Sequence, residues 1–407
     1  MECLRLITPH GNYYLDISDK NLTIRDFLWS HRVPFNSVSA YLIDKEGKVE
    51  SFPCLTKTII EIIESVGERE VVFGADRNID YQAILKKDIL ITKSDKKSVA
   101  EYSFDTHTGN SISHVMFNEE GCYEFVNTEV CKFVKEFCGN FQNTKIVVGI
   151  SGGGDSNTLI KSLINAGVNK CNIIPVMMLG IPDWDRGLSR AQAICSEVGL
   201  TLNIVTSEEV NQILGRNSST GNWACDFEKC YPEADLEVIG TLGIRLVLSH
   251  VARKNHTDVI VTGLNLEDIL SESLYSLLRG EALAKFPVRE VDGIKIWYPL
   301  YRCPKRMLDG CYPKLSLDNY MDRYPSKIYW RAASYYLAQS MSTIMPGIEF
   351  YLIDGLQKAS QNCPVNLKFY KELGFSAVPG LSEENISYWL SFLGKKDLHK
   401  ATSSNIN

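Results

Sequence analysis

The sequence predicts an α/β fold in which a doubly wound parallel sheet is joined to a small N-terminal α+β domain and a C-terminal helical extension. Two observations carry this prediction. Between residues 119 and 262, short apolar runs typical of buried parallel strands alternate with helical stripes. One of these runs ends in three successive glycines that open a helix. We place the domains at residues 1–100, 115–300 and 301–407, because a chain of this length can form several hydrophobic cores.

The N-terminal residues are expected to form two strands, a helix and a third strand. Alternating apolar positions predict a hairpin over residues 3–16 with its turn at residues 9–12, then a helix at 24–29 and a strand at 38–43. This order is similar to that of β-grasp modules such as the ubiquitin-like sulfur carriers. The chain continues without the terminal Gly-Gly that carries sulfur, so the resemblance implies a docking or substrate-recognition role.

A polar segment at residues 93–97 is interpreted as a linker, with a domain boundary near residues 95–115. Beyond it, apolar periodicity predicts strands and helices in alternation. The expected helices cover residues 119–137, 157–164, 186–198 and 233–254, and the expected strands cover residues 145–150, 173–179, 202–205 and 259–262. In such a sheet the ligand crevice lies at the carboxyl ends of the strands. Two candidate ligand loops, after the first and last of these strands, fall on that edge.

The first candidate loop is a glycine-rich turn that is expected to bind phosphate. A helix N-terminus presents unpaired N–H groups and the positive end of the helix dipole, and glycines let an anion approach the backbone. The Gly-Lys-Ser/Thr ending of a Walker A loop and the spacing of a dinucleotide fingerprint are both absent. The residues concerned are Ser151, Gly152, Gly153, Gly154, Asp155 and Ser156.

These six residues resemble the SGGxDS loop of the N-type ATP pyrophosphatase, or PP-loop, superfamily. The resemblance implies an enzyme that adenylates a carbonyl or similar oxygen with ATP, releases pyrophosphate and lets sulfur or nitrogen displace AMP. It also implies that all six residues bind the nucleotide, and that the backbone around Met178 contacts adenine.

The second candidate loop, residues 263–272, resembles the downstream motif of the tRNA two-thiocytidine and tRNA-lysidine synthetase branch. The chain keeps Gly263, Asn265, Asp268 and Glu272 of that motif, but has Leu264, Glu267 and Ser273 at three other positions. Gly263 and Asn265 are then expected at the nucleotide. Simple capping of a helix is the alternative interpretation of these polar residues.

The leaving pyrophosphate carries negative charge, which cations stabilise. We therefore expect catalytic roles for Lys161 and for two carboxylates that could hold a cation, those of Asp155 and Asp268. The two carboxylates are candidate Mg²⁺ ligands, because Mg²⁺ needs few protein ligands once ATP supplies oxygens. Lys161 or Arg279 is the candidate cation.

Cysteines mark a further candidate site. In the two-thiocytidine branch a C-x-x-C with a third cysteine holds an iron–sulfur cluster. The resemblance implies Cys225 and Cys230 as ligands here, with Cys303 or Cys311 as the third. Thiolates also bind zinc or carry persulfides. Inert buried thiols are the remaining alternative.

Basic and aromatic residues interleave between residues 301 and 331, which suits an RNA loop, ATP phosphates or a solvated surface. Helices are expected at residues 328–344 and 383–393. With a net charge of −6 and no long apolar run, the chain is expected to be cytoplasmic, without membrane or general nucleic-acid binding. A homodimer is left open.

The predicted function is ATP-dependent adenylation followed by thiolation of a tRNA base or small metabolite, with a sulfur donor protein as a candidate partner. The alternatives are amine transfer by a ligase and a non-catalytic ATP-binding scaffold.

Overall fold

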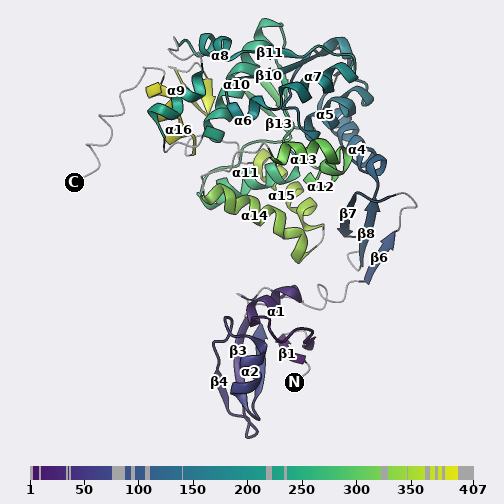
Figure 1. Ribbon diagram of the computed structural model, residues 1–407, viewed down its shortest axis with the longest axis vertical. Coiled ribbons are helices and arrows are strands. Elements are labelled where there is room, and N and C mark those ends of the chain that lie inside the picture. The colour runs from purple at the N-terminus through teal and green to yellow at the C-terminus, as the bar shows by residue number, and fades with distance from the viewer. Residues whose placement is uncertain are drawn as a thin grey trace, which may run out of the picture. The chain divides into compact units, whose positions relative to one another are not determined.

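A computed structural model of the protein forms two compact units (Figure 1). The first comprises residues 1–92, 103–114 and 340–348, and the second comprises residues 93–102, 115–339 and 349–407. The structure describes residues 3–8, 11–33, 35, 38–75, 88–92, 97–105, 111–139, 141–216, 222–232, 236–321, 329–345, 347–362, 367–371, 375–377 and 381–392.

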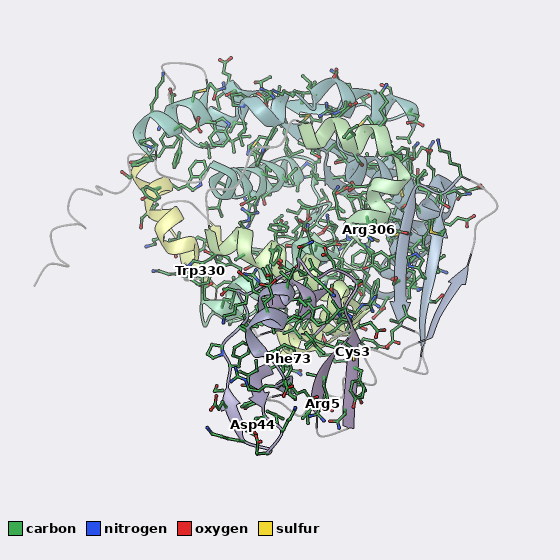
Figure 2. All side chains as sticks on the ribbon, turned by 60° about the horizontal axis from the view of Figure 1, so that its bottom comes forward. Cys3, Arg5, Asp44, Phe73, Arg306 and Trp330 are labelled. Atoms are coloured by element: carbon green, nitrogen blue, oxygen red, sulfur yellow. The ribbon has the colours of Figure 1, made fainter. Side chains whose placement is uncertain are left out.

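The N-terminal part of the first unit is a five-stranded sheet in the order β2-β1-β5-β3-β4. Central strands β1 and β5 are parallel, with Leu6 opposite Phe73, and both side chains are fully buried. Figure 2 labels Phe73 on this sheet. The predicted strand, strand, helix, strand order is present, although the turn residues Pro9 and His10 lie outside the described residues. The elements are β1 (Cys3–Thr8), β2 (Gly11–Asp16), α1 (Ile24–Ser30), β3 (Val38–Ile43), β4 (Val49–Ser51), α2 (Ile59–Val66) and β5 (Glu70–Ala75).

Strands occupy much of the segment that was expected to be a boundary. They are β6 (Asp88–Thr92), β7 (Ala100–Asp105) and β8 (Ser111–Phe117), in the order β6-β8-β7. Each of β7 and β8 buries one apolar side chain, Tyr102 and Ile112 respectively, and these strands were not predicted from the sequence. Residues 93–96 of the predicted linker lie outside the described residues.

The second unit contains a six-stranded sheet in the order β11-β10-β9-β12-β14-β13. All neighbours are parallel except the hairpin of β13 and β14. That hairpin was not predicted, although the Asp292-Gly293 pair at its turn, with φ of 53° and 72°, is a strong hairpin signal. The strands are β9 (Ile146–Gly149), β10 (Ile173–Met178), β11 (Asn203–Val205), β12 (Val259–Val261), β13 (Val288–Val291) and β14 (Ile294–Trp297).

The strand order reverses between β9 and β12. From β9 the chain proceeds to β10 and β11 on one side, and then returns to place β12 on the other side of β9. Loops that follow two strands at such a reversal diverge and leave a crevice between them. The two candidate ligand loops are the ones that follow β9 and β12, so the topology itself brings them together.

Helices surround this sheet. Long α10 packs on β9, β10 and β12, whereas α7 packs on β10 and α5 packs on α4. The helical segments are α4 (Glu119–Phe137), η2 (Phe141–Asn143), α5 (Gly154–Asn165), η3 (Lys170–Asn172), α6 (Pro182–Asp185), α7 (Leu188–Glu197), α8 (Ser207–Ile213), α9 (Trp223–Cys230), α10 (Leu236–Lys254) and α11 (Leu266–Leu278).

Helix α9 corrects a prediction, because residues 223–230 were expected to form a loop. Asn222 caps this helix by accepting hydrogen bonds from the amides of Ala224 and Cys225, each at 3.0 Å. Trp223 and Phe227 are fully buried on one face. A segment of eight residues contains too few helical turns for its periodicity to predict a helix from sequence. The cap and the packing therefore determine that these residues are helical.

The C-terminal part is not purely helical, because it contains the short hairpin of β15 and β16. Its first helix, α12, packs on α4 and α5 and belongs to the core of the second unit. The elements are α12 (Lys305–Cys311), α13 (Pro313–Met321), α14 (Tyr329–Ile344), α15 (Ile348–Asn362), β15 (Lys368–Tyr370), β16 (Phe375–Ala377) and α16 (Leu381–Phe392). Across the described segments, every helix is too short or too polar to cross a membrane.

Candidate active site

The glycine-rich loop connects β9 to the first turn of α5. The Ser151 amide donates to the Ser156 hydroxyl at 3.0 Å, and the two hydroxyls lie 3.0 Å apart. Helix α5 begins after Gly153 without a side-chain cap. Its first amides are therefore not capped by a side chain, and phosphate binding by residues 151–156 stays a prediction.

Gly152 brings the loop against the start of α7. Its φ is +77°, and a Cβ added there would lie 2.2 Å from the carbonyl oxygen of Gly187. Arg190 of α7 donates from Nε to the Gly152 carbonyl at 3.2 Å. The loop conformation therefore depends on close contact between two backbones, which only glycine permits.

Gly154 faces Ser316 of α13, a residue that the sequence analysis missed. A Cβ on Gly154 would lie 2.6 Å from the Ser316 hydroxyl oxygen. Ser316 is 4% exposed, and its hydroxyl has no hydrogen-bond partner among the described residues. A buried hydroxyl costs free energy when it is unpaired, so this one is a donor that a phosphate at the loop can use.

We expect Gly154→Ala to weaken ATP binding, because the new methyl group collides with Ser316 at the start of α5. The expected loss is about tenfold, from strain of about 1–2 kcal/mol. Adding Ser316→Gly should restore most of the affinity. Equilibrium titration with Mg-ATP measures all three proteins, and an equally weak double variant would contradict the steric explanation.

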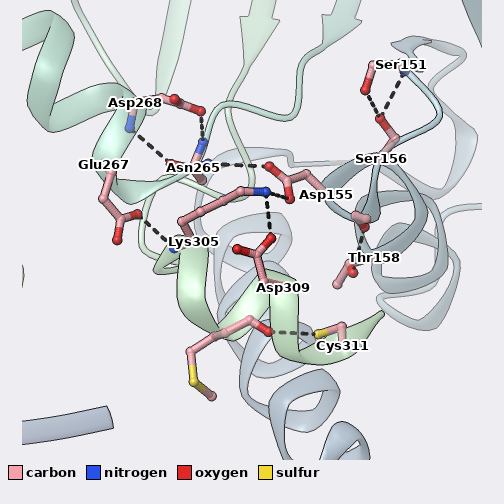
Figure 3. A network of polar contacts seen from close by, with 12 residues as sticks. Ser151, Asp155, Ser156, Thr158, Asn265, Glu267, Asp268, Lys305, Asp309 and Cys311 are labelled. Carbon is pink, nitrogen blue, oxygen red and sulfur yellow. Dashed lines mark hydrogen bonds and ion pairs between the residues drawn. The ribbon is translucent and has the colours of Figure 1, made fainter. Parts of the chain in front are cut away.

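Asp155, in the first turn of α5, lies where the two loops meet α12 (Figure 3). Its Oδ1 accepts from Lys305 Nζ at 2.6 Å, and its Oδ2 accepts from Asn265 Nδ2 at 3.4 Å. Lys305 also pairs with Asp309 at 2.9 Å. Burial lowers the pKa of the Lys305 ammonium, but the two carboxylates outweigh this effect and raise it overall. Residues far apart in the sequence therefore form one charged cluster.

Asn265 and Asp268 form a capping box at the start of α11. Asn265 Oδ1 accepts from the Asp268 amide and Asp268 Oδ2 accepts from the Asn265 amide, both at 3.0 Å. The capping interpretation is thus realised, and Asn265 in addition contacts Asp155. Tyr335 of α14 donates to Asp268 Oδ1 at 2.7 Å. Burial raises the pKa of the Asp268 carboxyl, and these hydrogen bonds offset part of that increase.

Glu267 lies beside this box and accepts a hydrogen bond from the Lys305 amide at 2.8 Å. Burial raises the pKa of its carboxyl to about 7, and the hydrogen bond from Lys305 opposes that increase. The folded protein therefore holds a proton on Glu267 between its ordinary pKa and about pH 7, whereas the unfolded chain releases it.

We expect the free energy of unfolding to fall as the pH rises through this window, by up to about 3 kcal/mol from Glu267 alone. A carboxyl with a raised pKa in the folded state stabilises the protein below the window and loses that contribution above it. Glu267→Gln retains an acceptor for the Lys305 amide and should flatten the dependence. Urea unfolding from pH 5 to pH 8 compares the two proteins, and parallel curves would contradict the assignment.

Other predicted cations and ligands pair elsewhere. Lys161 donates to Glu197 at 2.7 Å and lies over the ring of Tyr312. Arg279 pairs with Glu281 at 2.9 Å, and Glu272 pairs with Arg289 at 3.4 Å. The lysine that contacts Asp155 is Lys305, one of the basic residues between 301 and 331 for which ATP phosphates were one of three possible partners.

The predicted adenine edge lies at the end of β10. Met178 is 8% exposed, and the Gly180 amide donates to both carboxylate oxygens of Asp185 at 3.1 Å. Trp223 Nε1 donates to the Leu179 carbonyl at 3.3 Å. This edge is therefore held by side chains of α6 and α9, and its contact with adenine stays a prediction.

The cysteines that the structure describes do not form a cluster. In the part of the chain that the structure describes, no three His, Cys, Asp or Glu residues are grouped to hold a metal ion. Cys225 and Cys230 lie on α9, whereas Cys303 is fully buried before α12. Burial raises the pKa of the Cys303 thiol well above its ordinary value, and raises that of Cys311 to about 12.

The carboxylates of Asp155 and Asp268 can supply only part of the ligands that Mg²⁺ needs, so the nucleotide must supply others. Asp155 and Asp268 stand at the two adjoining loops, and their oxygens accept hydrogen bonds or the Lys305 ion pair. A hexacoordinate ion would take one or two carboxylates and draw its other oxygens from phosphates and water. The residues present are compatible with a metal that arrives bound to ATP.

Comparison with known families decides the class of the domain. A family model described as a PP-loop domain matches residues 126–324. This part of the chain is a PP-loop domain. The match confirms the predicted N-type ATP pyrophosphatase superfamily and an ATP-using enzyme. It extends past residue 300, so the PP-loop domain includes α12 and Lys305.

Three solved structures are similar to this chain, and the first of them shares its fold. The U34-tRNA thiolase NcsA from Methanococcus maripaludis, solved with its [4Fe-4S] cluster, has a TM-score of 0.53 and 19% identity over 70% of this chain and 92% of that one. An NH3-dependent NAD synthetase from Campylobacter jejuni has a TM-score of 0.35 and 16% identity, covering 61% and 99% of the two chains. NMN synthetase from Francisella tularensis has a TM-score of 0.35 and 12% identity, covering 61% and 98%. No curated protein matches the chain.

Proposed function

We propose that this protein adenylates the carbonyl or amide oxygen of a substrate with ATP and then exchanges the activated oxygen for sulfur. One observation carries the proposal: the hydrogen bond from Asn265 to Asp155 joins the phosphate loop to the second motif across the β9 and β12 switch point. That is where an α-phosphate held at α5 can meet a substrate held by α11.

The first step forms a bond between the substrate oxygen and the α-phosphorus and breaks the bond from the α-phosphorus to the oxygen that bridges to the β-phosphate. Pyrophosphate then leaves with the negative charge. The amides of α5 stabilise the phosphates, Lys305 supplies positive charge, and Mg²⁺ delivered with ATP would be held by Asp155 and Asp268. Attack by a sulfur nucleophile on the activated carbon expels AMP.

The acceptor is proposed to contain a planar ring, as a tRNA base or a small heterocyclic metabolite does. Helix α14, which contacts Asp268 through Tyr335, also exposes Trp330, labelled in Figure 2. Trp330 and Tyr336 have 56% and 67% of their surfaces accessible. Exposed aromatic side chains stack on bases. An acceptor stacked on these rings would lie on the same helix that contacts Asp268 through Tyr335.

A second candidate replaces sulfur with an amine. It is favoured by the lack of a three-residue metal-binding group among the described residues. The cysteines that the structure describes therefore do not fit an iron–sulfur cluster or zinc. The same adenylated intermediate would give an amide or amidine.

The test is product analysis with ATP labelled at the α-phosphate, using total tRNA or small heterocyclic amides as acceptor and sulfide or ammonia as donor. Formation of AMP and pyrophosphate only with acceptor supports adenylation, and the donor that gives product separates the two routes. Formation of ADP and phosphate would refute it. Binding of ATP without pyrophosphate release would favour a scaffold.

Iron and sulfide analysis of anaerobically purified protein, repeated for Cys225→Ala, tests the cluster separately. Iron that is present in the wild type and lost in the variant would show that a cluster is bound at α9. A metal-free protein would leave persulfide transfer or amine ligation.

A further inference from the structure

The phosphate loop contains no basic side chain, since residues 151–156 are serine, glycine and aspartate. The ammonium of Lys305 occupies the position beside Asp155 instead, 2.6 Å from Oδ1. Its side chain is 13% exposed and that of Asp155 is 22% exposed, so the pair is largely shielded from water. Such a pair is held firmly as long as no competing ion arrives.

One oxygen of the Asp155 carboxylate is the better placed to bind a metal ion. Its Oδ2 faces the amide group of Asn265, a donor that repels cations. A metal ion is therefore expected to bind Asp155 through Oδ1, at a distance of about 2.1 Å. There it would compete with the Lys305 ammonium, because two cations close to one oxygen repel each other.

We propose that Lys305 is a placeholder cation: it neutralises Asp155 in the free protein, and moves to the phosphates when Mg-ATP delivers its metal to that carboxylate. This inference rests on the proposed use of Mg-ATP. The four-carbon stem of lysine allows such a movement. Asp309, one helical turn further along α12, retains a second contact with the ammonium at 2.9 Å and limits how far it travels.

The proposal predicts that removing the charge of Lys305 changes the affinities for Mn²⁺ and for Mg-ATP in opposite directions. Lys305→Met keeps the length of the side chain and leaves Asp155 unpaired, so the free protein should bind Mn²⁺, an EPR-visible substitute for Mg²⁺, at least about tenfold more tightly. The same variant should bind Mg-ATP at least about tenfold more weakly, because a phosphate contact is lost. A merely structural role for Lys305 would weaken both.

Two variants complete the experiment. Lys295→Met removes a lysine that pairs with Asp258 at 3.0 Å outside the cluster and should change neither affinity more than about twofold. Adding Asp155→Asn to Lys305→Met should abolish the gain in Mn²⁺ affinity, which shows that the ion sits on Asp155. Lys305→Arg, which keeps the charge, should retain weak Mn²⁺ binding.

Weaker or unchanged Mn²⁺ binding by Lys305→Met would overturn the proposal, as would unchanged Mg-ATP affinity. If the wild type bound no Mg-ATP while the variant gained Mn²⁺ affinity, the proposed function would fall. Occupation of the metal position by Lys305 would still be upheld, so the two failures are distinguishable.

Discussion

Asp155→Asn is expected to lower the rate of AMP formation about 10²- to 10³-fold. The asparagine keeps the size of the side chain, and its single oxygen can still accept the hydrogen bond from Lys305. It loses the second acceptor, which faces Asn265, and the charge that attracts a metal-bound nucleotide. Lys305 keeps its pair with Asp309, so the fold should persist. AMP release, measured with ATP labelled at the α-phosphate, gives the rate, and thermal unfolding checks the fold.

Glu197→Gln is the matched control, because it also turns the carboxylate partner of a lysine into an amide. Glu197 belongs to α7 and pairs with Lys161 at 2.7 Å, with 58% of its side chain exposed. An exposed pair contributes little, so the rate should change less than about twofold. Equal losses in both variants would mean that Asp155 has no special part in the reaction.

Gly152→Ala is expected to lower the free energy of unfolding by about 2–4 kcal/mol and to eliminate detectable ATP binding. The added carbon would lie 2.2 Å from the Gly187 oxygen and 3.0 Å from the Ala191 nitrogen, both backbone atoms. Neither atom can rotate away, so the loop must separate from α7. Urea unfolding and equilibrium titration with Mg-ATP measure the two effects.

Gly199→Ala separates the close contact from the backbone conformation. Its φ is +73°, close to the +77° of Gly152, but an added Cβ would have nothing within 4 Å. Left-handed backbone without a collision should cost about 1 kcal/mol and leave ATP binding intact. If both variants lost stability equally, the contact with Gly187 would not be what makes Gly152 essential.

The sequence by itself determined the strand, loop and helix around residues 146–165. Each of these features is local: an apolar run, three glycines whose backbone can adopt the loop, and a stripe of apolar residues at helical spacing. It also placed the second motif after another buried strand, from which a shared site at one edge of a parallel sheet follows. The capping box of Asn265 and Asp268 was likewise contained in four adjacent residues.

Only the tertiary structure decided which residues complete that site. By sequence, Lys161 was the better candidate for the cation of the site, because it follows the loop. In the structure, Lys305 contacts Asp155, whereas Lys161 pairs with Glu197. Ser316 had no signal at all, since nothing around it marks a contact with Gly154. Such contacts depend on how α12 and α13 pack against α4 and α5. Periodicity and capping are local, whereas a partner about 150 residues away is chosen by packing that no short segment encodes.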